Sequence, residues 1–576
     1  MKTDYEWLGR RALERLEASV RDADDEQTSF LLDWLKENRD TRSGRRYGFS
    51  KIGSVREYQR QVPLSTYGDY AGDIERIIAG EKNILTARDA VYFCISSGTV
   101  GDEKYIPLTE YDLEAHYTFM YGAVFGQIRE YYKDLPGSAI FGKIFQIGEF
   151  AKTCMPDGTM NGIRSGCIYQ WLDRNGDFDA SDHCVPKEIL FPDTLEDRLY
   201  SKVRFALAER GLTAIHGVFI NRVAGVIEYI LHNWDLLLED MEFGTVSVDL
   251  SQEQRRYLIE KLTPDPGRAK ELRDIPRADL QKGIVKKIWK DIKYILAIGG
   301  DSFFYYTEKM RGYAEGVPVH YFVYAASEGV FGLAQEVGVP DRYILLPASV
   351  FFEFNPADQA ICADQAICAG QAICAGQAVP ADQICTPLLM GDVEVGKKYE
   401  LVITNRSGLY RYRVGDVVKV VGMHGKAPVV RFCYRRDQVI NLAGEKSDQQ
   451  QLDMAIKRFT ELAGIEVKGY CVSGHFSEIA PGYRFFMECE KAPPNAEELL
   501  ERCMCEANPG YKACRTMHEI SPLHIQYLRE GSFKRYEQML AGRGKSMAQS
   551  KRPLYLDTRE KRDFFAAQVI QREERL

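Results

Sequence analysis

Apolar side chains recur at helical spacing through the first forty residues, at Trp7, Leu8, Leu13 and Leu16 and again from Phe30 to Leu35. An α-helix with one buried face produces this period of three to four residues. We therefore expect helices at the start of the chain. Two later stretches, 258–275 and 283–298, also have helical patterns and are predicted to be helices.

Short apolar runs alternate with these helical patterns. VYFCI (91–95) and HYFVYA (320–325) each predict a buried strand that ends in a polar loop. Thr109 with Asp112 forms a capping-box pattern ahead of a long helix predicted to run through Tyr132. Strands that alternate with helices over such a length indicate an α/β body with parallel pairing.

The pattern changes from residue 399 onward. YELVIT, LYRYRV, VVKVVG and PVVRFCY predict four short antiparallel strands, with the Gly415-Asp416 pair as one of the turns. Ser447 with Gln450 predicts a second capping box, which opens a helix. Two β-type runs alternate with helices after it, so the chain is expected to end in a small α+β domain. We place its boundary near Asp437, which gives a large domain over 1–436 and a small one over 437–576.

Residues 357–385 form a low-complexity hexapeptide repeat, ADQAIC ADQAIC AGQAIC AGQAVP ADQIC. A cysteine array for metal binding and a small β-helix are two alternatives. Evenly spaced cysteines without histidine are poor zinc geometry, and a β-helix needs several stacked turns. We favour a tandem expansion of a surface loop, because the cost of closing a loop grows slowly with its length.

Composition excludes several classes of protein. Hydrophobic residues make up 45% and charged residues 27% of the chain, which is an ordinary globular balance. The net charge of −8 argues against nucleic acid as the main partner. The N-terminus lacks the apolar core of a signal peptide, and no apolar run is long enough to span a membrane. The 14 cysteines show no zinc or CxxC spacing, so we expect free thiols and a cytoplasmic location.

Three segments carry candidate chemistry. The loop from Ser96 to Lys104 could surround phosphate oxygens with N–H groups, hydroxyls and one lysine, although such loops are also ordinary turns. Tyr324 could lie against a purine, and Glu328 could hold Mg²⁺; the alternatives are a core tyrosine and a solvated glutamate. Asp416 could accept hydrogen bonds from ribose hydroxyls, or it could be a turn residue.

The order in which these segments occur along the chain is more informative than any one of them alone. A serine/threonine loop, then YxxSEG, then YRxGD, then RRDxxxxxxG (435–444) resembles the acyl-adenylate-forming superfamily. Within it, the chain resembles the Gretchen Hagen family of acyl acid–amido synthetases. Residues 299–332, 393–422 and 432–450 carry this resemblance over their full length, as do GSFKRYEQMLAGRG and SKRP near the C-terminus.

The resemblance implies a fold and a set of site residues. The fold would be a large multi-subdomain α/β N-terminal body joined by a hinge at Asp437 to a smaller α+β C-terminal domain. The implied roles, residue by residue, are phosphate orientation by Ser96, Ser97 and Thr99, adenine and neighbouring contacts by Tyr324 and Ser327, Mg²⁺ binding by Glu328, ribose binding by Asp416, and nucleotide contacts by Lys446 and Lys551. The phosphate loop is one residue shorter than the family pattern SSGTxxGxxK and carries Asp102, so no role is carried over to Lys104.

The implied reaction is ATP-dependent. A carboxylate attacks the α-phosphorus of ATP to form an acyl-adenylate, and an amine, most simply an amino acid, then takes the acyl group. Two alternatives stay open at this point: an acyl-CoA ligase that forms a thioester, and a non-catalytic relative that only binds nucleotide. The sequence does not identify the acid.

Overall fold

The computed structural model describes most of the chain in two compact units. The described residues are 4–97, 103–148, 150, 153–192, 198–280, 282–299, 304–357, 373–374, 377–378, 386–435, 440, 442, 447–476, 481–489, 493–516, 520–541, 552–556 and 558–570. The larger unit holds the residues up to Ser96 with Lys104–Val414 and Lys419–Arg431, and the smaller is built mainly from Phe432 onward, with Gly415–Val418. Among the described helices, none is long and apolar enough to cross a membrane.

The larger unit begins with the predicted helices, α1 (Tyr5–Arg21) and α2 (Ala23–Glu37). Three further helices, which were not predicted, follow as α3 (Arg42–Tyr47), α4 (Val55–Gln61) and α5 (Ala71–Ile78), with short 3₁₀ turns η1 (Phe49–Lys51) and η2 (Tyr67–Asp69) between them. Asp4 caps α1 by accepting the N–H of Trp7. Leu8 and Leu16 are buried as the pattern predicts, but Trp7 is 48% exposed and does not belong to the core. A Cβ on Gly9 would lie 2.6 Å from the backbone N of Gly126, so the small residue is what lets α1 lie close to a later helix.

A small sheet has the order β2-β1-β5-β4 and carries the predicted phosphate loop. Its strands are β1 (Tyr92–Ser97), β2 (Glu103–Leu108), β4 (Thr153–Cys154) and β5 (Met160–Gly162), and β1 pairs with β5 in parallel. The long helix after it starts at Thr109 as predicted, as α6 (Glu110–His116), a π-helical segment η3 (Tyr117–Gly122) and α7 (Ala123–Tyr131). The predicted capping box is wrong, because the Thr109 hydroxyl instead donates to the carbonyl oxygen of Arg406 at 2.9 Å.

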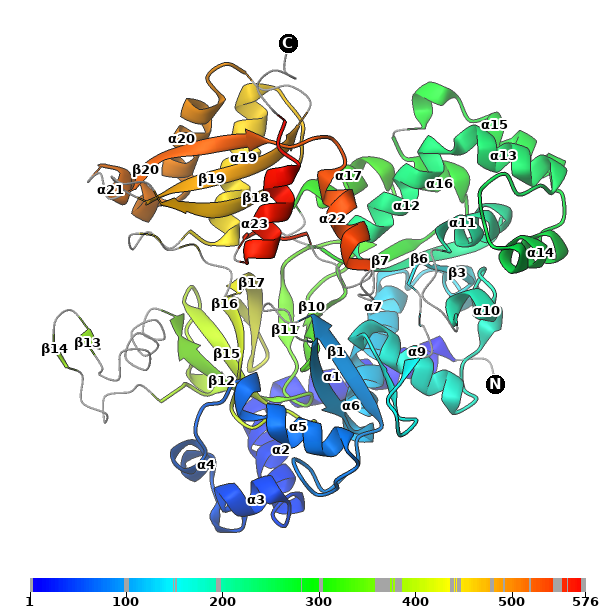
Figure 1. The fold of residues 1–576 in the computed structure, drawn as a ribbon. Helices are drawn as coiled ribbons and strands as arrows, with labels where there is room; N and C mark the ends of the chain where they lie inside the picture. The colour runs from blue at the N-terminus through cyan, green and yellow to red at the C-terminus, as the bar shows by residue number, and fades with distance from the viewer. Residues whose placement is uncertain are drawn as a thin grey trace. The chain divides into compact units, whose positions relative to one another are not determined.

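A parallel sheet of order β3-β6-β7-β8 confirms the α/β prediction (Figure 1). Its strands are β3 (Lys143–Gln146), β6 (Leu212–Phe219), β7 (Tyr294–Ile298) and β8 (Val319–His320). Helices of this region include α8 (Gly137–Ile140), α9 (Arg164–Arg174), η4 (Ala180–Asp182), α10 (Lys187–Leu190), α11 (Leu199–Ala208), α12 (Ile220–His232), α13 (Trp234–Phe243), α14 (Gln252–Lys261), α15 (Pro266–Arg273), η5 (Arg277–Asp279), α16 (Ile284–Ile288) and α17 (Phe304–Tyr313). The stretch 283–298, predicted to be one helix, is the short α16 followed by β7.

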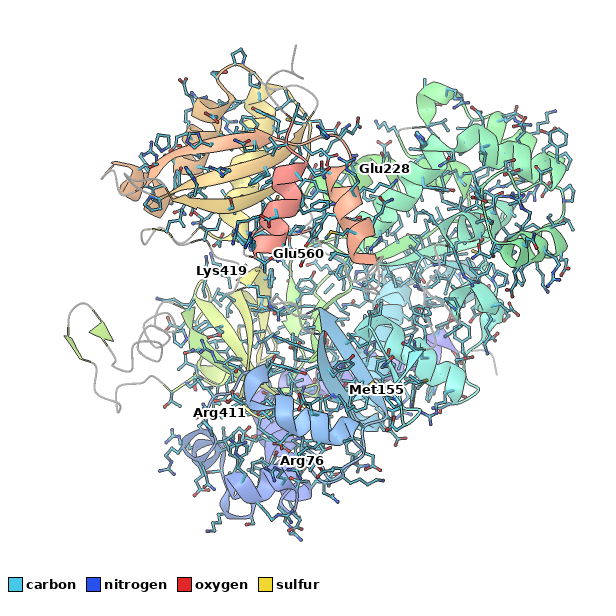
Figure 2. The ribbon with its side chains drawn as sticks, in the orientation of Figure 1. Arg76, Met155, Glu228, Arg411, Lys419 and Glu560 are labelled. Carbon is cyan, nitrogen blue, oxygen red and sulfur yellow. The ribbon has the colours of Figure 1, made fainter. Side chains whose placement is uncertain are left out.

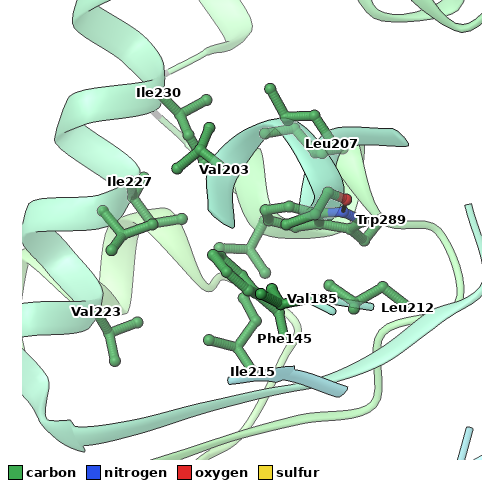
Figure 3. Packing of buried hydrophobic residues seen from close by; sticks show 14 of the residues in the cluster. Phe145, Val185, Val203, Leu207, Leu212, Ile215, Val223, Ile227, Ile230 and Trp289 are labelled. Carbon is green, nitrogen blue, oxygen red and sulfur yellow. Dashed lines mark hydrogen bonds between the residues drawn. The ribbon is translucent and has the colours of Figure 1, made fainter. Parts of the chain in front are cut away.

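The core of this region packs helices on the parallel sheet. Phe145 and Ile215 of the sheet lie with Val223 and Ile227 of α12 and with Trp289 (Figure 3). Trp289 is fully buried, and its indole N–H donates to the carbonyl oxygen of Ala206 at 2.7 Å. This hydrogen bond satisfies the polar atom of an otherwise apolar side chain.

A seven-stranded sheet of order β12-β15-β16-β17-β11-β10-β9 holds the second and third motifs. Its strands are β9 (Val323–Ala326), β10 (Gly329–Ala334), β11 (Tyr343–Leu345), β12 (Phe351–Pro356), β15 (Lys398–Thr404), β16 (Tyr412–His424) and β17 (Ala427–Arg435), and η8 (Met390–Asp392) precedes β15. The predicted strand 320–325 is divided between two sheets, with β8 in the parallel sheet and β9 here. The second half of LYRYRV (from Tyr412) and the whole of VVKVVG lie in the single strand β16, so the predicted turn at Gly415 is wrong; Gly415 lies within the strand at φ 83°.

The smaller unit has an α+β fold. A sheet of order β18-β19-β20 joins β18 (Val467–Phe476), β19 (Pro481–Cys489) and β20 (Ser521–Tyr527). Its helices are α19 (Gln449–Ala463), α20 (Ala496–Ala507), α21 (Pro509–Thr516), α22 (Ser532–Ala541) and α23 (Arg559–Ala567). The predicted capping box is displaced by one residue: Asp448 and Gln451 form it, while the Ser447 hydroxyl accepts from Tyr483 at 2.8 Å. Strand β20 was not predicted.

Within the hexapeptide repeat, the structure describes only Ala357 and a two-stranded hairpin, β13 (Ile373–Cys374) with β14 (Gln377–Ala378). The remaining positions of the repeat lie outside the described residues.

Candidate nucleotide and acyl-transfer site

Glu328 is the best-defined residue of the candidate site. It lies at the turn between β9 and β10 and is only 4% exposed, so the prediction of a solvated glutamate is excluded. The Tyr412 hydroxyl donates to its Oε1 at 3.1 Å, and the Asn405 amide donates to its backbone oxygen at 2.7 Å. Asn405 in turn accepts the N–H groups of Ser407 and Leu409. The carboxylate is therefore held in a fixed orientation by two neighbouring strand ends.

Tyr324 lies in an aromatic cluster on the same sheet. Its ring centroid is 5.4 Å from that of Phe331 and 5.9 Å from that of Tyr343, and the residue is 8% exposed. Gly332 stands opposite Tyr324 in the β10–β9 register, where a Cβ would lie 2.9 Å from that of Tyr343. The structure thus fixes the ring by packing, and its contact with adenine remains a prediction.

Ser327, in the turn between β9 and β10, contacts β1 and α9, and through α9 it is linked to α6. Arg164 Nη1 donates to the Ser327 backbone oxygen at 3.3 Å and forms an ion pair with Asp112 at 2.7 Å. The Cys94 thiol, on β1, lies close enough to the Ser327 side chain for that side chain to lower the thiol pKa against the effect of burial. These contacts bring the strand that opens the serine/threonine loop next to the Tyr324–Glu328 segment.

The buried groups around Ser327 support the site without supplying a nucleophile or base. Burial raises the pKa of the Cys94 thiol to about 12, and it also raises the pKa of Cys167. Burial lowers the pKa of His116, whose Nδ1 lies 3.6 Å from the Cys167 sulfur, well below its usual range. At neutral pH these side chains are therefore uncharged, and the Arg164 guanidinium lies near both thiols.

Asp416 follows Gly415 in β16 and belongs to the smaller unit. It is 5% exposed, and Arg435 Nε lies 3.6 Å from its Oδ1. The alternative of a solvent-exposed turn residue is therefore excluded for Asp416. Burying an ion without a partner is costly, and Arg435 is the partner here. Its predicted contact with ribose is not tested by these contacts.

Several predicted residues cannot be placed. Ser96 and Ser97 end β1, but nothing is described of their side chains. Thr99, Lys446, Lys551 and the hinge residue Asp437 lie outside the described residues. Lys104 is on β2 with Nζ 5.4 Å from the Tyr67 ring centroid, a cation–π contact.

Arg411 was overlooked as a structural residue of the third motif. It is a non-glycine residue at φ 49° and is 4% exposed. Figure 2 labels its position. Its guanidinium pairs with Glu353 at 2.8 Å, and Nη1 donates to the carbonyl oxygens of Gln59 and Val62. Tyr412 is the next residue, so this buried pair fixes the backbone from which the Tyr412 hydroxyl reaches Glu328.

Comparison with known proteins identifies the family. The GH3 family N-terminal domain matches residues 12–319, the central domain 343–435 and the C-terminal domain 450–560. The chain belongs to the GH3 family. The predicted family resemblance is thereby confirmed.

Relatives of this GH3 protein match it over almost its whole length. The indole-3-acetic acid-amido synthetase GH3.3 of Arabidopsis thaliana is 26% identical, with 94% of this chain and 91% of the relative covered. The jasmonoyl–L-amino acid synthetase GH3.5 of Oryza sativa subsp. japonica is 26% identical, with 95% and 94% covered. The solved structure of the GH3.15 acyl acid amido synthetase has a TM-score of 0.79 at 23% identity and covers 97% of this chain and 96% of its own. This last likeness confirms the fold: a large N-terminal body with a C-terminal domain.

Proposed function

We propose that this GH3 protein is a ligase that activates a carboxylic acid as its acyl-adenylate and transfers the acyl group to an amino acid, forming an amide. The membership of the GH3 family, together with relatives named as amido synthetases over more than nine-tenths of the chain, supports this function. The buried and oriented Glu328 is the structural observation that supports the nucleotide site most directly.

In the first half-reaction, a carboxylate oxygen of the acid attacks the α-phosphorus of ATP, and the bond to pyrophosphate breaks. Ser96, Ser97 and Thr99 would orient the β- and γ-phosphates, Tyr324 would contact adenine beside Ser327, and Asp416 would accept the ribose hydroxyls. Lys446 and Lys551 would neutralise charge that develops on the phosphates.

Glu328 fits the role of a magnesium ligand. Mg²⁺ prefers oxygen ligands and is commonly held by one or two carboxylates together with substrate phosphates. No group of three or more His, Cys, Asp or Glu side chains is arranged around a metal position in the part of the chain that the structure describes. When bound, Mg²⁺ would neutralise phosphate charge, while Tyr412 keeps the Glu328 carboxylate in one orientation.

In the second half-reaction, the amine attacks the acyl carbonyl carbon and AMP leaves. We propose that the smaller domain moves about a hinge at Asp437 between the two half-reactions, which would open a path for the amine. A reducing cytoplasm suits the 14 cysteines of such an enzyme.

The test is ATP–pyrophosphate exchange with a panel of carboxylic acids that includes indole-3-acetate, jasmonate and benzoates. The proposed function predicts exchange that depends on one class of acid. No exchange with any acid, by a folded protein that binds ATP, would support the non-catalytic alternative. Exchange followed by a thioester with coenzyme A, and no amide with amino acids, would support the acyl-CoA ligase alternative.

A further inference from the structure

The short helix α3 presents three arginines on one face. Arg42, Arg45 and Arg46 are at positions i, i+3 and i+4, which are neighbours on a helix surface, and all three are exposed. Together with Arg76 of α5 and with Lys82 they line an open groove on the surface. We call these five residues the basic groove; Glu81, Asn83 and Ile84 complete its lining.

The basic groove has more cations than acids. Asp73 pairs with Arg42 at 3.1 Å, Glu81 with Arg76 at 2.6 Å and Asp89 with Lys82 at 2.6 Å. Arg45 and Arg46 have no ion-pair partner among the described residues, and the Arg46 guanidinium lies 5.2 Å from the Tyr47 ring centroid. The positive charges of these two arginines are therefore not paired with a carboxylate among the described residues, although the net charge of the chain is −8.

Backbone hydrogen bonds join the two segments that line the basic groove, α3 and residues 81–84. The backbone N–H of Arg42 donates to the Asn83 oxygen at 2.8 Å, and that of Ser43 donates to the Ile84 oxygen at 3.0 Å. Asn83 is a non-glycine residue at φ 56°, a sparsely populated conformation that persists where surrounding contacts enforce it. The segment 81–84 is therefore held against α3, and the arginines are presented by a fixed backbone.

We propose that the basic groove binds a small soluble anion that carries two or more phosphate groups. The planar guanidinium fork matches phosphate oxygens, and the open groove lets several arginines reach one anion at its surface. An anionic membrane is disfavoured, because none of the strongly exposed large apolar side chains among the described residues lines the groove. A long nucleic acid is disfavoured by the net negative charge of the chain. The groove shares no residue with the proposed nucleotide site and does not depend on the proposed function.

Isothermal titration with inorganic tripolyphosphate tests the proposal. The double substitution R45E/R46E is expected to weaken binding at the groove by roughly tenfold or more, and to flatten the salt dependence of that binding. The matched control is R56E/R60E, which makes the same charge change on two exposed positions of α4. This control, and Asp416→Ala in the proposed nucleotide site, should both retain the groove binding.

Each other outcome overturns the proposal. Equal affinity in R45E/R46E and the unsubstituted protein would show that the groove holds no phosphate. Equal weakening in R45E/R46E and R56E/R60E would show a general effect of surface charge. Tighter binding of anionic vesicles or duplex RNA than of tripolyphosphate, lost in R45E/R46E, would make the groove a macromolecule surface. ATP–pyrophosphate exchange, measured in parallel, reports separately on the proposed function.

Discussion

At the scale of single residues, Glu328 shows how hydrogen bonds from other strands orient a buried carboxylate. Its exposed fraction is 4%, so the orientation of the carboxylate depends on the Tyr412 hydroxyl and on the turn that Asn405 holds. Neither partner was assigned a role from the sequence. A single chain gives the motif residues, but a hydrogen bond between strands that are far apart in sequence becomes visible only after the strands have been paired.

Tyr412→Phe is expected to raise the Mg²⁺ concentration needed for half-maximal exchange by roughly two- to tenfold. The reason is that a hydrogen bond to the oriented carboxylate contributes about 0.5–1.5 kcal/mol. The measurement is exchange rate against free Mg²⁺. Tyr410→Phe is the matched control, because it removes a buried hydroxyl that donates to the Leu85 oxygen at 2.9 Å and does not contact Glu328. An unchanged Mg²⁺ profile in Tyr412→Phe, or an equal shift in Tyr410→Phe, would contradict the positioning role.

Asp416→Ala is expected to weaken ATP binding by roughly ten- to a hundredfold, because hydrogen bonds to a charged group contribute about 1.5–3 kcal/mol. The fold should persist, since Arg435 is partly exposed and can be solvated. KM for ATP in the exchange reaction is the measurement, with thermal unfolding as the check on folding. Asp392→Ala, at an exposed position, is the control. Unchanged exchange kinetics in the folded Asp416 variant would remove this residue from the site.

At the scale of elements, periodicity predicted the N-terminal helices, the parallel sheet and the strands around each motif. It did not predict that 320–325 would divide into β8 and β9 or that β16 would run through Gly415. Both errors have the same cause. Strand boundaries here depend on pairing with strands that are distant in sequence, and the spacing of apolar residues within one segment contains no information about that pairing. The first capping box is absent and the second is displaced by one residue for a related reason: the Thr109 and Ser447 hydroxyls bond to Arg406 and Tyr483, which are distant in sequence.

The pair of Glu353 on β12 with Arg411 links two elements of the larger unit. Glu353→Ala is expected to destabilise the unit by about 3–5 kcal/mol, because it leaves a buried guanidinium without its counterion. Denaturant unfolding measures the change. Asp40→Ala removes the exposed partner of Arg39 and should cost less than about 1 kcal/mol. Comparable losses in both variants would show that the buried pair does not hold the backbone before Tyr412.

The hexapeptide repeat lies between β12 and β15, which pair from Phe351 with Thr404 to Pro356 with Tyr399. Excision of residues 357–380 is expected to leave exchange activity within about twofold, because the connection between two paired strands can be shortened at small entropic cost. The exchange rate and the unfolding midpoint are compared with those of the full chain. Lost activity in a folded deletion variant would show that the repeat has a part in the reaction.

At the scale of the whole molecule, the proposed function requires one chain to perform two chemical steps, adenylation of the acid and transfer of the acyl group. The order of motifs identified adenylation from the sequence, and membership of the GH3 family supports an amine as the acceptor. The acid could not be predicted, because an acyl pocket is lined by side chains from scattered elements.

Labelling the carboxylate oxygens of the acid with ¹⁸O tests whether an acyl-adenylate forms and is captured by an amine. Pooled carboxylic acids labelled with ¹⁸O in the carboxylate are incubated with ATP, Mg²⁺, amino acids and coenzyme A, and the products are analysed by mass spectrometry. An acyl-adenylate captured by an amine predicts an amide product and one ¹⁸O atom in AMP, because the oxygen that attacks the α-phosphorus leaves with AMP. Label in inorganic phosphate with formation of ADP, or a thioester in place of the amide, would contradict the account.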